Sequence, residues 1–68
     1  MKAKELLKLL KEETDIELQI DGDHVCYTTA GDAMNEKLNM YNDLLNSNIN
    51  ELSIKNDPWG SYIKISVI

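Results

Sequence analysis

Arginine is absent from this sequence of 68 residues, and all seven basic residues are lysines. Arginine is the side chain best suited to pairing with phosphates and stacking on bases. Twelve acidic residues give the chain a net charge of -5. A negative chain without arginine is poorly suited to binding nucleic acid or an anionic membrane surface directly. The composition therefore favours a partner that is itself a positively charged protein.

Cysteine and histidine each occur once, as Cys26 and His24. A single cysteine excludes an internal disulfide and leaves no cysteine cluster for structural zinc. The glycine-rich motifs that bind phosphates are missing as well. Residues two apart in a strand share a face, so Cys26 and His24 could meet as a thiolate–imidazole pair, but we expect both on a solvent-facing surface without a pocket. We predict no catalytic residues, no metal and no cofactor, and therefore not an enzyme.

Long apolar runs are also lacking. No stretch approaches the roughly 20 residues that a membrane-spanning helix needs, and no segment resembles a secretory leader. Hydrophobic residues make up 43% of the chain, which is ordinary for a globular protein. We expect one domain over residues 1–68, complete as it stands and cytoplasmic, with a thin core because so short a chain buries only about 60% of its surface.

Two segments show the helical period. Apolar residues recur every three or four positions over residues 2–13, which predicts a helix there. The same spacing predicts a second helix within residues 33–46, after a small and polar stretch. The residues that carry the two patterns are Ala3, Leu6, Leu7, Leu10, Met34, Leu38, Tyr41 and Leu45. Whether residues 28–38 form helix or loop is left open by the sequence.

Four segments alternate between apolar and polar residues, as strands with one buried face do. The first two flank Asp21-Gly22, a strong signal for a two-residue hairpin turn, which would place Leu18 opposite Val25 and Ile16 opposite Tyr27. The other two flank a turn at residues 56–60, where the only proline stands. The second hairpin ends the chain, and its final strand could serve as an edge for pairing.

This order of elements predicts an α+β domain. Helix, hairpin, helix and hairpin (αββαββ) would form a four-stranded antiparallel sheet with both helices on its apolar face. The other face of the sheet would lie in water.

Acidic residues gather between positions 12 and 23, where six carboxylates occur without any lysine or arginine. Such a field attracts a basic partner, repels nucleic acid, and could mimic a phosphate backbone. The alternative is a solvated face that maintains solubility. Asp21, Asp23 and His24 could hold part of a metal site, but no fourth ligand is indicated, and a polar turn favoured for its φ angles is the better explanation.

Trp59 and Tyr62 flank Gly60 in the second turn. Aromatic side chains at an exposed turn can anchor an interface, although a lone tryptophan in a small domain can instead fold back over the sheet. Combined with the acidic segment, they complete our set of candidate partner-binding residues: Glu13, Asp15, Glu17, Asp21, Asp23, Trp59 and Tyr62.

Several segments of the chain resemble a group of very short proteins of phages and prophages of Gram-positive bacteria. The similar segments are Lys4-Glu5-Leu6-Leu7-Lys8-Leu9-Leu10, Thr14-Asp15-Ile16-Glu17-Leu18, Leu44-Leu45-Asn46 with residues 49–54, and Ile63-Lys64-Ile65-Ser66-Val67-Ile68. The asparagine-rich residues 35–50 depart from that pattern. The resemblance implies a phage-encoded protein that acts on host machinery by binding. Inhibitors of CRISPR nucleases are similar in size and charge only.

The leading hypothesis is a non-enzymatic inhibitor that docks its acidic hairpin on a basic, nucleic-acid-handling bacterial protein such as a defence nuclease. The alternative is a structural, assembly or accessory protein that acts through self-association as a homo-oligomer. A thiol or metal enzyme at His24 and Cys26 is the third and weakest reading.

Overall fold

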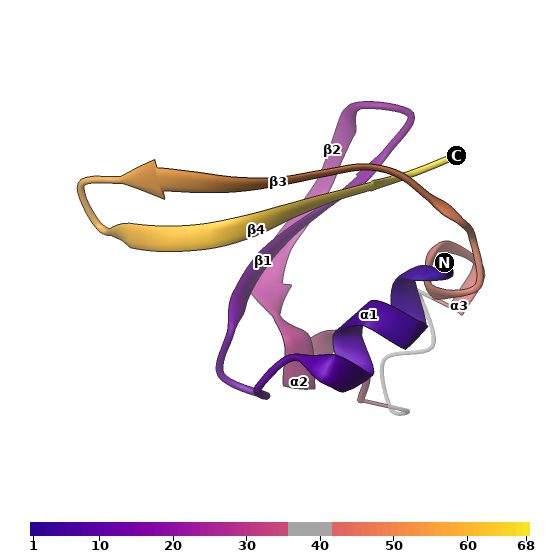
Figure 1. The fold of residues 1–68 in the computed structure, drawn as a ribbon, viewed down its shortest axis with the longest axis horizontal. Coiled ribbons are helices and arrows are strands. Elements are labelled where there is room, and N and C mark those ends of the chain that lie inside the picture. The colour runs from indigo at the N-terminus through magenta and orange to yellow at the C-terminus, as the bar shows by residue number, and fades with distance from the viewer. Residues whose placement is uncertain (36–41) are drawn as a thin grey trace.

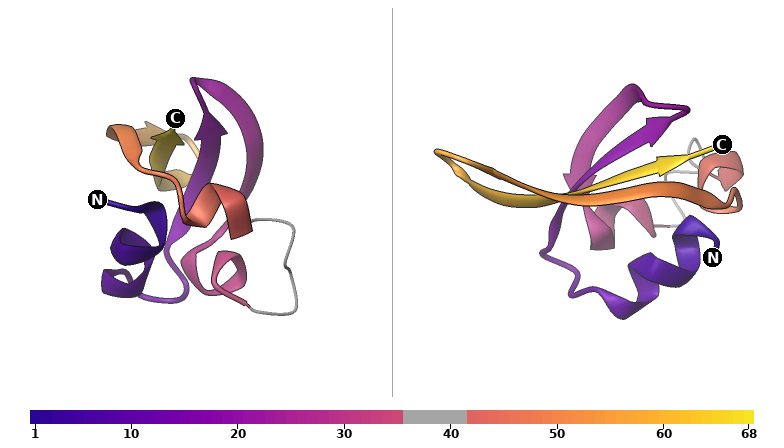
Figure 2. Two further views of the ribbon diagram at one scale, coloured as in Figure 1. Left: turned by 90° about the vertical axis from the view of Figure 1, so that its right-hand side faces the viewer. Right: turned by 45° about the horizontal axis from the view of Figure 1, so that its top comes forward.

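A computed structural model describes residues 1–35 and 42–68 of the chain. In these residues a four-stranded sheet packs on short helices, which lie on one side of it (Figures 1 and 2). The elements in chain order are α1 (Ala3–Leu9), β1 (Asp15–Ile20), β2 (Asp23–Thr29), α2 (Ala30–Ala33), α3 (Asn42–Leu45), β3 (Ile49–Asp57) and β4 (Gly60–Val67). The α+β class and the four strands are thereby confirmed. None of these helices is long and apolar enough to cross a membrane.

The sheet is mixed, so the predicted antiparallel arrangement is wrong. Its order is β2-β1-β4-β3, with β1 and β4 parallel and both hairpins antiparallel. Alternation of apolar residues fixes which face of a strand is buried but not the direction of its neighbour. Here Ile16 lies beside Ile63 and Leu18 beside Ile65, which places two apolar rows on one face. β4 is therefore an inner strand, and the predicted edge at the end of the chain is also wrong.

The core lies between the sheet and the helices. The central strands and the three helices all contribute to one cluster of buried apolar side chains: Ala3, Leu7, Ile16, Leu18, Ala30, Ala33, Leu44, Leu45, Ile65 and Val67. No buried side chain of this cluster comes from β2 or β3. The two inner strands therefore hold the fold together, and the two outer strands extend it.

The first hairpin has the predicted turn but only half of the predicted register. Asp21 and Gly22 adopt φ angles of 51° and 84°, as a two-residue turn requires. A β-bulge then inserts one extra residue, Val25, so that Leu18 pairs with Cys26 and Glu17 with Tyr27. The predicted opposition of Leu18 to Val25 and of Ile16 to Tyr27 is therefore wrong.

The helices are shorter than the sequence predicts. α1 ends at Leu9 rather than near residue 13, and Leu10 is already extended. The predicted helix over residues 33–46 is wrong at its start, because α2 ends at Ala33. The side chain of Thr29 caps α2 by accepting a hydrogen bond from the backbone N–H of Asp32 at 3.2 Å. Within the predicted range, residues 36–41 lie outside the described residues, and Asn42–Leu45 is helical as α3.

The second hairpin extends beyond the helices as an arm, seen at the left of Figure 1. Its turn at Pro58 and Trp59 lies where the sequence predicts it, and the backbone N–H of Trp59 donates to the Asp57 carboxylate at 2.9 Å. Because no helix covers this arm, Leu52 and Ile54 are exposed although they share the face of the buried Ile65. Trp59 is 93% exposed and does not fold back over the sheet.

Candidate binding surface

The sheet face opposite the helices carries a polar and aromatic row. Glu17 and Gln19 on β1 are nearly fully buried there, although no helix covers them. They sit between the larger side chains of β2 and β4, among which His24, Tyr27 and Tyr62 make ring contacts. The bulge at Val25 makes these ring contacts possible, because the extra residue turns Tyr27 to the same face as His24. Their ring centroids are 4.6 Å apart.

Glu17 is the centre of this polar row. Its Oε2 accepts a hydrogen bond from the Gln19 side-chain amide at 2.8 Å and lies 2.9 Å from Nδ1 of His24. The bond from Gln19 and the contact with His24 lower the pKa of the Glu17 carboxyl, against burial, which raises it. Glu17 is therefore ionised at neutral pH. Its charge is satisfied within the fold and is not available as an open anionic contact.

A carboxylate and the imidazole that it orients are two of the three members of a nucleophilic triad. The third partner would be a nucleophile, and Cys26 is the natural candidate. However, the bulge places Cys26 on the opposite face, where it packs against the core. The predicted sharing of one solvent face by His24 and Cys26 is therefore wrong, and the Glu17–His24 pair lies beside the ring of Tyr27 instead.

Tyr27 and Tyr62 meet edge to face across β1, with ring centroids 5.8 Å apart. Burial raises the pKa of the Tyr62 hydroxyl, and the neighbouring Tyr27 raises it further. Tyr62 thus remains a neutral hydrogen-bond donor at physiological pH. Such an aromatic pair offers a rigid, partly apolar contact surface with polar tips.

Beside this pair lies a groove of about 570 Å³, between the start of β1, the end of β2 and the turn at Pro58 and Trp59, which we call the distal turn. It is lined by three carboxylates, from Asp15, Asp32 and Asp57, and by the rings of Tyr27, Trp59 and Tyr62. Among the residues that the structure describes, no lysine lines this groove. We call this site the acidic aromatic groove. Its chemistry suits a cation, since carboxylates attract positive charge and aromatic faces bind it.

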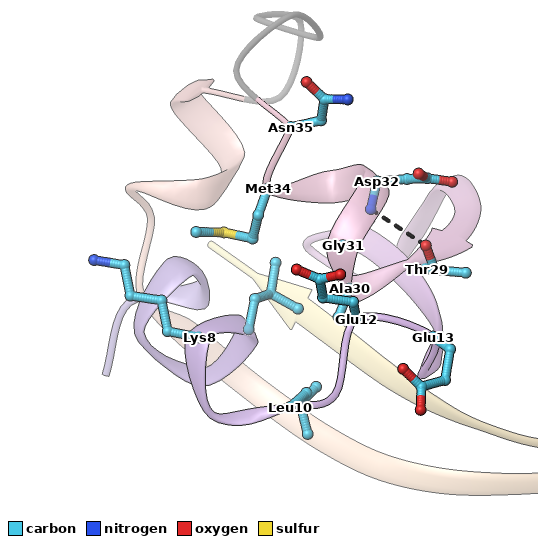
Figure 3. A pocket seen from close by; sticks show the side chains of 11 residues that line it. Lys8, Leu10, Glu12, Glu13, Thr29, Ala30, Gly31, Asp32, Met34 and Asn35 are labelled. Carbon is cyan, nitrogen blue, oxygen red and sulfur yellow. Dashed lines mark hydrogen bonds between the residues drawn. The ribbon is translucent and has the colours of Figure 1, made fainter.

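A second hollow, of about 740 Å³, lies between α1, α2 and the turn before β1. Figure 3 shows Lys8 and Met34 on one side of it, and Glu12, Glu13 and Asp32 on the other. Gly31 also lines this hollow, and its backbone N–H donates a hydrogen bond to the Glu12 carbonyl at 2.9 Å. This hollow combines both charge signs with apolar side chains, so its electrostatic preference is weaker than that of the groove.

The seven predicted contact residues do not form one patch. Asp15, Trp59 and Tyr62 meet in the acidic aromatic groove, and Glu13 lines the hollow of Figure 3. Asp21 and Asp23 are exposed at the far end of β1, about 20 Å away by strand geometry. Glu17, between them, is buried. The acidic segment of the sequence is therefore split by the strand that carries it.

Sequence reasoning missed Asp32, Asp57 and Tyr27 as members of the groove. Asp32 lies in the small and polar stretch before the second predicted helix, where it could cap that helix, and Asp57 lies in the predicted turn at residues 56–60. These local roles are sufficient reasons for both residues. Tyr27 was expected on the helix-covered face, because no residue signals the bulge at Val25. Their convergence depends on the parallel pairing of β1 with β4, which brings the distal turn to the start of β1.

In the described ranges 1–35 and 42–68, no group of three His, Cys, Asp or Glu side chains is arranged to hold a metal ion. The three carboxylates of the groove therefore line it without converging on one point. Comparisons with protein-family models, with curated proteins and with solved structures yield no match.

Proposed function

We propose that this chain is a non-enzymatic protein-binding module that receives a basic segment of a partner protein in the acidic aromatic groove. The observation that carries the proposal is the meeting of three carboxylates and three aromatic rings, with no lysine among the lining residues of the described part of the chain. Because no lysine of residues 1–35 or 42–68 lines the groove beside these carboxylates, an external lysine or arginine supplies the missing charge. The rings of Trp59 and Tyr62 add cation–π and apolar contact with the alkyl stem of that side chain.

The partner is a bacterial protein whose basic surface handles nucleic acid. A basic site that holds phosphates also attracts a small protein of net charge -5. Occupying that surface would exclude the nucleic acid, which makes the chain an inhibitor or modulator. The resemblance to small phage proteins supports a setting in the cytoplasm of a bacterial host, where a defence nuclease is one such partner.

The test is an affinity capture from host lysate with a matched pair of variants. The groove variant carries Asp15→Asn, Asp32→Asn and Asp57→Asn, which remove three charges and keep side-chain shape, including the acceptor for the Trp59 N–H. The control variant carries Asp21→Asn, Asp23→Asn and Asp43→Asn, which remove the same net charge at exposed sites outside the groove.

We expect the wild type and the control variant to retain the same basic, nucleic-acid-handling protein, and the groove variant to lose it. The captured protein is then tested in its own reaction, where added wild-type chain should displace its nucleic acid. Equal loss by both variants would show that only net charge matters and would contradict the role of the groove. Retention by all three would contradict it as well.

A further inference from the structure

β3 is an open edge of the sheet, and it differs from the other edge, β2. A β-bulge at Val25 interrupts β2, and bulges are one way in which proteins prevent edge pairing. The irregularity of β3 lies at its start, between Ile49 and Glu51, and from Glu51 to Asp57 the strand pairs regularly with β4, without a bulge or a proline. Its unpaired side is thus a template for a further strand.

The backbone alternation of β3 follows from its partner. The Val67 carbonyl is directed to Asp21, which follows β1, and the Ile68 N–H to Asn48, which precedes β3. Even-numbered residues of β4 therefore direct their backbone groups to β3, and their partners on β3 are odd-numbered. It follows that Leu52, Ile54 and Asn56 direct their backbone N–H and C=O groups to the free edge.

The side chains of this edge are complementary to themselves. Glu51, Ser53 and Lys55 share the face opposite the helices, and Leu52 and Ile54 share the other. When β3 is laid antiparallel to a second copy about a two-fold axis at Ser53, Glu51 lies opposite Lys55 of the second copy. Leu52 then lies opposite Ile54 of the second copy, and each contact occurs twice.

This register also satisfies the backbone. It opposes Leu52 and Ile54 of the two copies, which are the residues whose backbone groups point outward. Ser53 and the Glu51–Lys55 pairs then fall at the non-hydrogen-bonded positions, where facing side chains lie closest together. Moving the axis to Ile54 would place Glu51 opposite Asp57, and moving it to Leu52 would remove the acid from opposite Lys55.

The hydroxyl of Ser53 supports the same register independently of the charged pairs. Its Oγ is buried and has no hydrogen-bond partner in the described part of the chain. A buried hydroxyl without a partner is destabilising. Rotation of this side chain about χ1 turns the hydroxyl from its covered position towards the free edge, where the two Ser53 hydroxyls meet on the two-fold axis and one can donate to the other. The same pairing brings the exposed Leu52 and Ile54 into contact with their counterparts.

We propose that the chain forms a two-fold homodimer in which β3 pairs antiparallel with β3 of a second copy, centred on Ser53. The two sheets then become one of eight strands. This inference does not depend on the proposed function. The acidic aromatic groove is lined by β1, β2 and the distal turn, and its lining includes no β3 residue before Asp57.

The test uses charge reversal at the two pairs, followed by sedimentation over a range of concentrations. Glu51→Lys alone places like charges at both pairs, and so does Lys55→Glu alone. Each should raise the dimer dissociation constant about tenfold or more. The double variant Glu51→Lys/Lys55→Glu should restore it. A mixture of the two single variants should form the heterodimer, because each supplies the charge that the other needs. A reducing agent excludes a disulfide through Cys26.

Ile54→Pro provides a second test that does not involve charge. It removes an N–H directed to the free edge, so the β3–β4 ladder and the circular dichroism spectrum should persist while the dimer is lost. A wild type that remains monomeric up to about 1 mM would overturn the proposal. Single variants that dimerise like the wild type, or a double variant that remains monomeric, would overturn this register.

Discussion

The two hairpins of this domain have nearly the same alternating pattern and very different surroundings. In the first, Ile16 and Leu18 are 1% and 0% exposed. In the second, Leu52 and Ile54 alternate in the same way but are 52% and 71% exposed. β1 lies inside the sheet beneath the helices, whereas β3 is an edge on an arm that extends past them (Figure 1).

The difference shows that alternation specifies an apolar face but not what covers it. The first hairpin supplies β1, the core strand. The buried Glu17 and Gln19 lie between the two acidic ends of this strand. The second hairpin supplies the distal turn of the groove and an open edge. Stability therefore depends mainly on the first hairpin, whereas the groove is built from both hairpins and the exposed edge belongs to the second alone. Substitutions in the core and on the arm should separate these contributions.

The largest contrast should appear at matched apolar positions of the two hairpins. Leu18→Ala leaves a cavity in the core and should lower the free energy of unfolding by about 3 kcal/mol. Ile54→Ala, on the exposed arm, should lower it by less than about 1 kcal/mol. Urea unfolding at a dilution that keeps the protein monomeric measures both. Equal costs would contradict the division between core hairpin and exposed hairpin.

Gly31→Ala should be the next most damaging change. A Cβ at this position would lie 3.0 Å from Cβ of Glu12 and 3.1 Å from its carbonyl oxygen. The chain before β1 would have to shift, at a cost of about 1–3 kcal/mol. The urea midpoint reports this directly. An unchanged midpoint would show that the contact between Glu12 and Gly31 is not tight in solution.

Glu17 should make stability depend on pH. Its pKa in the folded protein is below its ordinary value of 4.5, so its contribution to stability is present above that value and is lost as the pH falls through the folded pKa. Above that range Glu17→Gln should be less stable than the wild type by about 1–2 kcal/mol, and the two should converge in acid. A difference that is constant from neutral pH into acid would contradict the ionised, hydrogen-bonded role of Glu17.

Trp59→Ala should have the smallest effect on stability and a large one on binding. The side chain is 93% exposed, so its loss should change the free energy of unfolding by no more than about 0.5 kcal/mol. Capture of a basic partner should nevertheless fall sharply. A destabilised Trp59→Ala variant would instead show that the ring packs on the sheet.

Much of the local structure could be predicted from the sequence, and the associations between elements could not. Asp21-Gly22 specifies its turn because few other pairs accept two positive φ angles. The second turn and the strands beside it follow from Pro58 and the period of two. In contrast, no residue type signals the bulge at Val25, which reassigns Cys26 and Tyr27 to opposite faces from those expected.

The candidate site shows the same limit. Trp59 and Tyr62 are predicted as aromatic side chains at an exposed turn and Asp15 as part of the acidic segment, and these three lie together in the groove. Glu13, Glu17, Asp21 and Asp23 are grouped with Asp15 only because they are close to it in the sequence. An extended strand separates its ends by about 3.3 Å per residue, so neighbours along the chain become distant in space. Asp32 and Asp57 join the groove through the parallel pairing of β1 and β4, which local patterns do not encode.

The most direct test of the groove uses Trp59, the only tryptophan, as a fluorescent reporter. A hexa-arginine peptide is titrated into the wild type, the groove variant and the charge-matched control at physiological salt. We predict saturable quenching or a spectral shift for the wild type and the control. The groove variant should bind the peptide at least about tenfold more weakly. An equal response from all three proteins, or equal weakening of both variants, would contradict the account.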